Sequence, residues 1–177
     1  GKGVQCVSLK ENDFVENLFV ASTHDYVLFF TNFGKVYRLK VHELPVGNRT
    51  TKGSAIINVI ETLAEGEKVK AVITTRDFPE DNYLMFATKQ GMVKKTAMSE
   101  YDRTRKDGLI AINLKDGDEL VNVRRVHPGD KVVLCSSDGK AILFDEAEAR
   151  SMGRGTSGVR GITLKGDATM LGMEITN

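Results

Sequence analysis

Gly108-Leu109-Ile110-Ala111-Ile112-Asn113-Leu114 is one copy of a pattern, G-x-x-x-[VI]-x-[LV], that occurs four times in this chain. The copies begin at Gly3, Gly53, Gly108 and Gly158, so the glycines are separated by 50, 55 and 50 residues. Self-similarity at a period of about 50 residues is typical of repeat architectures, in which each repeat is one supersecondary unit. The pattern therefore predicts an array of similar modules along the chain.

A second recurring pattern lies between these glycines and indicates a β-hairpin. Each copy is a run rich in apolar residues, then a turn glycine, then a second extended run; the copies span residues 25–36, 82–93 and 130–141. An Asp or Asn stands nine residues before the turn glycine, and a Thr or Ser stands three residues before it. Apolar runs of this length suit buried strands, and glycine accepts the positive φ that a tight turn requires.

Each repeat is predicted to hold about four strands. After the hairpin come a polar loop, the motif glycine with a short strand such as 56–60, and a closing strand. The closing strands are predicted at 69–74, 120–126 and 169–175. Four-stranded units at this period suggest the blades of a propeller-like, all-β array. Residues 145–150 could form a single helical turn.

The period also divides the chain into modules. We expect a half-repeat at 1–23, followed by three repeats at about 24–75, 76–128 and 129–177. Because the chain opens inside a repeat, we expect it to be a piece of a longer array. Such a piece leaves an unpaired strand edge, which is a site for pairing or aggregation.

Basic residues collect in equivalent loops of the three repeats. The stretches from turn glycine to motif glycine (34–53, 91–108 and 139–158) hold thirteen Lys and Arg against seven Asp and Glu. The rest of the chain holds twelve against seventeen, and the net charge of +1 hides this separation. Equivalent positions of an array face the same way, so these loops should form a basic stripe along one rim. A phosphate backbone requires such a stripe; the alternative is that the loops are charged only because they are solvated.

The candidate DNA contacts are the basic side chains of these loops, together with Lys2 and Arg160 beside and within the glycine-led motif. The loop residues are Lys35, Arg38, Lys40, Arg49, Lys52, Lys94, Lys95, Arg103, Arg105, Lys106, Lys140, Arg150 and Arg154. Ser, Thr and Gly are interleaved with them, which lets a phosphate backbone approach closely and adds further donors. The sequence shows no recognition helix or zinc-finger spacing, so any sequence preference is expected to come from DNA deformability.

Two stretches of this chain resemble the C-terminal domain of DNA gyrase A. They are Phe29–Pro45 (FFTNFGKVYRLKVHELP) and Ser151–Gly153 followed by Thr156–Ile162 (SMG and TSGVRGI), and the resemblance covers essentially the whole chain. It implies a β-pinwheel, whose four-stranded blades exchange strands with their neighbours. It also implies that the pinwheel wraps DNA on a basic outer rim and so supports the ATP-dependent negative supercoiling of the whole enzyme.

The resemblance extends to partners and location. It implies duplex DNA, the remainder of gyrase A and, through it, gyrase B as partners, with no membrane, in the bacterial cytoplasm beside the chromosome. The family's basic box, Gln-Arg-Arg-Gly-Gly-Lys-Gly, is matched here only by Gly1-Lys2-Gly3, and the later blades of a complete pinwheel are missing. Two alternatives stay open: the related chain of topoisomerase IV, which carries the same repeat, and a protein-interaction propeller.

No catalytic constellation is expected in this piece. Thr23-His24-Asp25 has the residue types of a triad, but neighbouring residues of a strand point to opposite faces. The sequence has no P-loop or dinucleotide glycine pattern, and we expect no cofactor or metal. The resemblance places the DNA-cleaving tyrosine in a different domain, so none of the four tyrosines is a candidate. The carboxylates that recur in tight turns are interpreted as solvated charge.

The cysteines and the apolar residues bound the remaining classes. Cys6 and Cys135 are far apart along the chain and lack metal-ligand spacing, so we predict free thiols in buried strands. No run of about 18 apolar residues is present, which predicts no transmembrane helix. The N-terminal residues lack the apolar core of a signal peptide.

Overall fold

The computed structural model describes residues 24–43, 63–104 and 108–176, and the statements below concern these residues. Their secondary structure is β-strand with three short 3-10 helices. The strands are β1 (Tyr26–Thr31), β2 (Lys35–Lys40), β3 (Val69–Thr75), β4 (Tyr83–Thr88), β5 (Met92–Ala97), β6 (Leu109–Ile110), β7 (Leu120–Val126), β8 (Lys131–Ser136), β9 (Ala141–Asp145), β10 (Val159–Arg160) and β11 (Met170–Thr176). The 3-10 helices are η1 (Val41–Glu43), η3 (Met98–Tyr101) and η4 (Glu146–Glu148).

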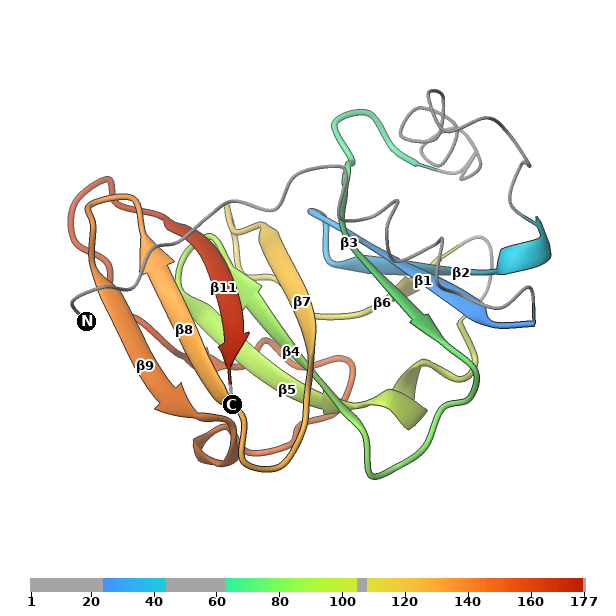
Figure 1. Cartoon of the computed structure of the whole chain (residues 1–177). Coiled ribbons are helices and arrows are strands. Elements are labelled where there is room, and N and C mark those ends of the chain that lie inside the picture. Colours follow the sequence, from blue (N-terminus) through green and yellow to red (C-terminus); the bar gives the residue numbers. More distant parts are fainter. Residues whose placement is uncertain (1–23, 44–62, 105–107, 177) are drawn as a thin grey trace, which may run out of the picture.

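Three antiparallel sheets lie side by side (Figure 1). The first has the strand order β3-β1-β2-β6, the second β7-β4-β5-β10 and the third β11-β8-β9. Strand β7 contacts both β3 and β11, so these three strands form the inner side of the array. The opposite, outer edges are formed by β6, β10 and β9. The predicted all-β, propeller-like fold is confirmed.

The hairpin strands and closing strands predicted from the sequence are present, whereas the short strand predicted at 56–60 lies outside the described residues. The three hairpins are β1–β2, β4–β5 and β8–β9, and their turn glycines all have positive φ. The closing strands are β3, β7 and β11, within one residue of the predicted bounds. The predicted helical turn at 145–150 is η4, in which the Asp145 and Glu148 side chains form a capping box with the backbone.

The glycine-led motif exchanges strands between sheets. Strand β6 follows Gly108 of the second repeat, yet it pairs with β2 of the first sheet; β10 follows Gly158 of the third repeat and pairs with β5 of the second. The short strand expected inside its own unit therefore completes the outer edge of the preceding sheet. This is the strand exchange that the resemblance implies.

The motif glycines make this exchange sterically feasible. Gly108 has φ +97°, and a Cβ atom there would lie 2.7 Å from Cε1 of Tyr37. Gly158 has φ +88°, and its Cβ would lie 2.2 Å from the carbonyl oxygen of Val93. Any other residue would be strained at this φ and would also collide with the preceding sheet.

The hydrogen bonds of the exchange repeat from one sheet to the next. In the first sheet, the carbonyl oxygen of Gly34 accepts bonds from the backbone N–H groups of Ala111 (2.8 Å) and Ile112 (3.2 Å). In the second, Gly91 accepts bonds from Gly161 (2.8 Å) and from the residue after it (3.2 Å). The turn glycines of the first two hairpins thus serve as acceptors for the next repeat's motif.

Two apolar cores fill the spaces between neighbouring sheets. The core between the first and second sheets contains Phe30, Phe86 and Tyr101, all fully buried. The Phe30 ring meets the other two edge-to-face, with centroid distances of 5.4 and 5.8 Å. The core between the second and third sheets is aliphatic and includes Met85 and Leu134. Because the sheets share these cores, they are packed together as one body.

One prediction about the cysteines is wrong. Cys135 lies on β8 and is buried, as expected, but it is disulfide-bonded rather than a free thiol. The prediction relied on separation along the chain, which does not limit distance in space once repeats are packed side by side. Cys6 lies outside the described residues. Within the described ranges, no helix is long and apolar enough to cross a membrane.

Candidate nucleic-acid interface

The second and third predicted basic loops lead to the outer edges of the sheets, whereas residues 44–53 of the first loop lie outside the described residues. Each of these two loops leaves the outer strand of a hairpin and ends at a strand that closes the outer edge of the preceding sheet. The second loop joins β5 to β6, and the third joins β9 to β10. The topology therefore carries their basic residues to the side opposite β3, β7 and β11.

The candidate residues fall into three groups. Six are exposed: Lys35, Lys40, Arg103, Lys140, Arg150 and Arg160. Arg38 and Arg154 are half-buried, whereas Lys94 and Lys95 are buried. Lys2, Arg49, Lys52, Arg105 and Lys106 lie outside the described residues.

The half-buried arginines are held by the backbone of neighbouring segments. Arg38 Nη1 donates to the carbonyl oxygen of Asp102 at 2.5 Å, and the guanidinium lies 4.7 Å from the ring centroid of Tyr26. Arg154 Nη1 donates to the carbonyl oxygen of Ile110 at 3.0 Å. A guanidinium has five N–H donors, so each arginine keeps donors for a further acceptor while its position is defined.

Two of the exposed residues have weaker backbone anchors. Lys140 Nζ donates to the carbonyl oxygen of Thr163 at 3.2 Å, and Arg160 Nη1 donates to that of Gln90 at 3.4 Å. Both bonds are solvent-exposed. They orient the side chains along the outer edge without removing them from water.

Lys94 and Lys95 do not match the expectation of a solvent-exposed contact. Lys94 is 0% exposed, and its Nζ donates to backbone carbonyls, including that of Ala111 at 2.6 Å. Lys95 Nζ donates to the Glu146 carboxylate at 2.9 Å and to the carbonyl oxygen of the same residue at 3.3 Å. The loop of the third repeat covers both, since Met152 N–H donates to the carbonyl oxygen of Lys95 at 2.7 Å. In this arrangement neither ammonium group is presented to a phosphate.

Burial also changes the acid–base properties of Lys94. The pKa of Lys94 is lowered from 10.5 to about 7, mainly by desolvation and also by the positive charge of Arg154, while Glu100 opposes the shift. Burial also raises the pKa of Tyr101, whose hydroxyl donates to the same carbonyl oxygen of Ala111 at 3.1 Å. Lys94 and Tyr101, at the start of the second loop, therefore form a buried polar cluster around the carbonyl oxygen of Ala111.

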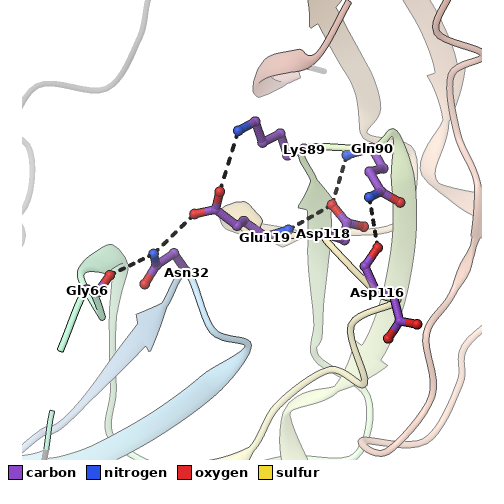
Figure 2. Close-up of polar contacts among 7 residues, drawn as sticks. All are labelled: Asn32, Gly66, Lys89, Gln90, Asp116, Asp118 and Glu119. Carbon is purple, nitrogen blue, oxygen red and sulfur yellow. Dashed lines mark hydrogen bonds and ion pairs between the residues drawn. The ribbon is translucent and has the colours of Figure 1, made fainter. Parts of the chain in front are cut away.

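The acidic turns lie between the inner ends of the sheets. Figure 2 shows Asn32 of the first sheet donating to the carbonyl oxygen of Gly66 (3.1 Å) and to the Glu119 carboxylate (3.2 Å). Lys89 of the second sheet lies 3.5 Å from the same carboxylate. The Asn32 amide holds the pKa of Glu119 below its usual range, with the Lys89 charge as a smaller contribution. The turn thus connects neighbouring sheets.

Two carboxylates predicted to be solvated are buried instead. Glu67 is 6% exposed and accepts hydrogen bonds from the hydroxyls of Thr31 (2.6 Å) and Tyr37 (3.1 Å). Asp118 is 9% exposed and accepts from the backbone N–H groups of Gln90 (2.9 Å) and Glu119 (2.8 Å). The tight turns fold back against the hairpins, so these side chains order the turns rather than extend into water. Among the described residues, no group of three His, Cys, Asp or Glu could hold a metal ion.

Sequence reasoning missed the role of Lys94 and Lys95, although a signal was present. Aligning the turn glycines places Lys94 opposite Tyr37 and Ile142 of the other hairpins. Tyr37 is buried at this position. A position that holds Tyr or Ile in two repeats predicts burial in the third, and a charge count cannot register this.

Comparison with known proteins identifies similar sequences over the whole chain. The family model described as DNA gyrase C-terminal domain, beta-propeller, matches residues 1–22, 25–76, 82–127 and 130–177. DNA gyrase A of Clostridium acetobutylicum is 46% identical over 161 residues, which are 91% of this chain and 19% of that protein. Its counterpart in Neisseria gonorrhoeae is 50% identical over 146 residues, which are 82% of this chain and 16% of that protein. The chain therefore spans about a fifth of the length of these relatives.

Solved structures show the same arrangement. The C-terminal domain of DNA topoisomerase IV aligns with a TM-score of 0.76 and 31% identity, covering 88% of this chain and 48% of that one. The DNA gyrase A C-terminal domain aligns with a TM-score of 0.66 and 29% identity, covering 86% of this chain and 48% of that one.

Proposed function

Because the chain belongs to the family of DNA gyrase C-terminal domains, we propose that it binds duplex DNA on the outer edges of its sheets and bends it. One observation carries this proposal. Exposed basic residues recur on or beside the outer strands of successive sheets: Lys35 and Lys40 on β2, Lys140 just before β9, Arg103 and Arg150 in the loops that lead to β6 and β10, and Arg160 on β10.

The contacts in this proposal are to the phosphate backbone. Exposed Lys and Arg neutralise phosphates and release counterions, which supplies affinity without base readout. A path across several sheets forces the duplex to curve, at a cost of about 1–6 kcal/mol for a site of 20–30 base pairs. Contacts on successive sheets offset this cost.

In the longer protein, the module acts mechanically. The bent DNA presents a neighbouring segment for strand passage by the rest of gyrase A together with gyrase B, in the bacterial cytoplasm. Negative supercoiling, driven by ATP, belongs to that whole enzyme, and this piece contributes the DNA path.

The proposal is tested by neutralising four basic residues, with a matched control. The outer-edge variant changes Lys35, Lys40, Arg103 and Lys140 to Gln. The control changes four exposed lysines outside these loops to Gln, namely Lys68, Lys115, Lys131 and Lys165. Both variants lose four positive charges.

Binding to a relaxed duplex is measured as a function of salt. Each lost phosphate contact reduces the slope of log K against log salt by about 0.9. We therefore expect the outer-edge variant to lose about 3 to 4 units of slope and the control to keep the wild-type value. Equal losses in both variants would contradict an outer-edge site. No DNA retention by the wild type at low salt would favour a protein-interaction propeller instead.

A further inference from the structure

The Lys94 ammonium group is enclosed by backbone carbonyls. Its Nζ lies 2.6 Å from the carbonyl oxygen of Ala111, 2.8 Å from that of Arg154 and 3.5 Å from that of Gly153. An ammonium group has three N–H donors and no acceptor, so these carbonyls match its donors in number. The Phe86 ring lies beside the group, with its centroid 4.9 Å from Nζ.

These carbonyls belong to two different crossovers. Ala111 follows β6, which carries the second repeat onto the first sheet. Gly153 and Arg154 precede β10, which carries the third repeat onto the second sheet. Lys94 itself lies on β5 of the second sheet. One side chain therefore ties together two consecutive strand exchanges.

The two crossovers carry exposed or half-exposed basic residues. Arg103 precedes β6, whereas Arg150 and Arg154 precede β10. A second contact also joins these segments, because Arg154 N–H donates to the Glu100 carboxylate at 3.1 Å. The spacing between the segments sets the spacing between their cations, and Lys94 lies at the point where they meet.

The repeat does not require a lysine at this position for folding. The equivalent residues are Tyr37 in the first hairpin and Ile142 in the third, and neither carries a charge. Burying an ammonium group is costly, and the lowered pKa of Lys94 reflects that cost. An unfavourable group at a position that accepts Tyr or Ile points to a role beyond filling the core.

We infer that Lys94 is a positioning residue for DNA binding: by holding both crossovers, it sets the curvature of the DNA path across neighbouring sheets without contacting the phosphates. The inference rests on the proposed DNA-binding function. It gives Lys94 a role in DNA bending that requires no contact between Lys94 and the phosphates. It separates two properties of the complex, the number of phosphate contacts and the degree of bending.

The test measures these two properties separately in the full chain. Lys94→Met keeps the apolar stem and removes the ammonium group, and Lys94→Tyr installs the residue of the first hairpin. Lys140→Gln is the matched control on the exposed edge. The salt slope counts phosphate contacts, and energy transfer between dyes on the two ends of a duplex of about 40 base pairs, at saturating protein, reports bending.

For Lys94→Met, we expect an unchanged salt slope and a loss of at least half of the bending signal. For Lys140→Gln, we expect a slope lower by about 0.9 with the bending signal retained. Wild-type bending by both Lys94 variants would overturn the inference, as would a slope lower by about one unit, which would make Lys94 a phosphate contact. If neither variant folds, Lys94 serves the fold itself and the inference is wrong. If the wild type binds DNA without bending it, the inference about Lys94 is wrong and the proposed DNA binding stands. If the wild type does not bind DNA, both proposals are wrong.

Discussion

The joint between the first and second sheets and the joint between the second and third share one backbone plan but differ in side-chain chemistry. In both, a motif glycine with positive φ packs against the preceding sheet, and a turn glycine carbonyl accepts two N–H groups. In the first joint, the neutral hydroxyl of Tyr37 and the half-buried Arg38 occupy the outer strand. In the second joint, the buried ammonium groups of Lys94 and Lys95 occupy the equivalent positions.

This difference separates what the repeat requires from what it tolerates. The glycines and the carbonyl acceptors recur in both joints because the backbones meet there. The outer-strand side chains do not recur, since each forms hydrogen bonds with the particular segment that packs over it. A basic residue at an equivalent position is therefore a half-buried edge residue in the first joint (Arg38) and a buried residue that connects segments in the second (Lys95).

The largest expected effect comes from breaking the Lys95–Glu146 ion pair of the second joint. Lys95→Met removes the cation from the Glu146 carboxylate, whose side chain is 10% exposed. An uncompensated buried charge costs about 3–5 kcal/mol. Arg38→Met, the equivalent change in the first joint, removes a solvent-exposed bond to a carbonyl and should cost about 1 kcal/mol. Urea unfolding measures both, and similar losses would contradict the difference between the joints.

The backbone plan is tested by filling the motif glycines. Gly158→Ala places a methyl group 2.2 Å from the Val93 carbonyl oxygen at a positive φ, so we expect a loss of about 3 kcal/mol. Gly108→Ala meets the Tyr37 ring at 2.7 Å and should cost somewhat less, because a ring can shift more than a backbone. Gly155→Ala is the control: no atom lies within 4 Å of its Cβ position, and its effect should stay within about 0.5 kcal/mol. If thermal unfolding shows that Gly155→Ala destabilises the protein as much as the other two variants, the motif glycines have no special role in the two joints.

The inner side of the joints differs as well, at equivalent turn positions. Asn32 is 5% exposed and also accepts a hydrogen bond from Lys68 N–H at 2.7 Å. Asn32→Ala leaves these hydrogen-bonding partners unsatisfied and should lower the free energy of unfolding by about 2 kcal/mol. It should also raise the pKa of Glu119, which can be followed by NMR titration. Lys89→Ala removes only an exposed ion pair and should cost less than about 0.5 kcal/mol; a larger loss than for Asn32→Ala would reverse the comparison.

The smallest effect is a pH dependence confined to the second joint. Lys94 has a folded pKa of about 7 against 10.5 for the free side chain. Between these values the unfolded chain binds more protons than the folded chain, so the stability of the wild type rises with pH. From about pH 7 to 8 the rise should be about 1 kcal/mol. Lys94→Met should lack it, and identical profiles for the two proteins would show that this lysine does not titrate near neutral pH. Above about pH 10 the raised pKa of Tyr101 acts in the opposite direction.

Much of the fold could be predicted because it depends on local chemistry. Apolar runs bounded by turn glycines located the hairpins, and β7 spans the residues predicted for it. The concentration of Lys and Arg in the loops is likewise a property of the sequence. The destination of β6 could not be predicted from spacing, since its pairing with β2 joins residues of different repeats, Lys35 with Ile110 and Val36 with Leu109.

The candidate interface divides in the same way. The sequence alone determined the strands, the turns that require glycine and the loops that hold the basic residues, because each depends on residues a few positions apart. Only the tertiary structure decided that Lys35 and Lys140 are exposed while Lys94 and Lys95 are buried. The physical reason is that solvent exposure depends on which distant segment packs over a strand, and the loop at 151–154 packs over β5 from the next repeat.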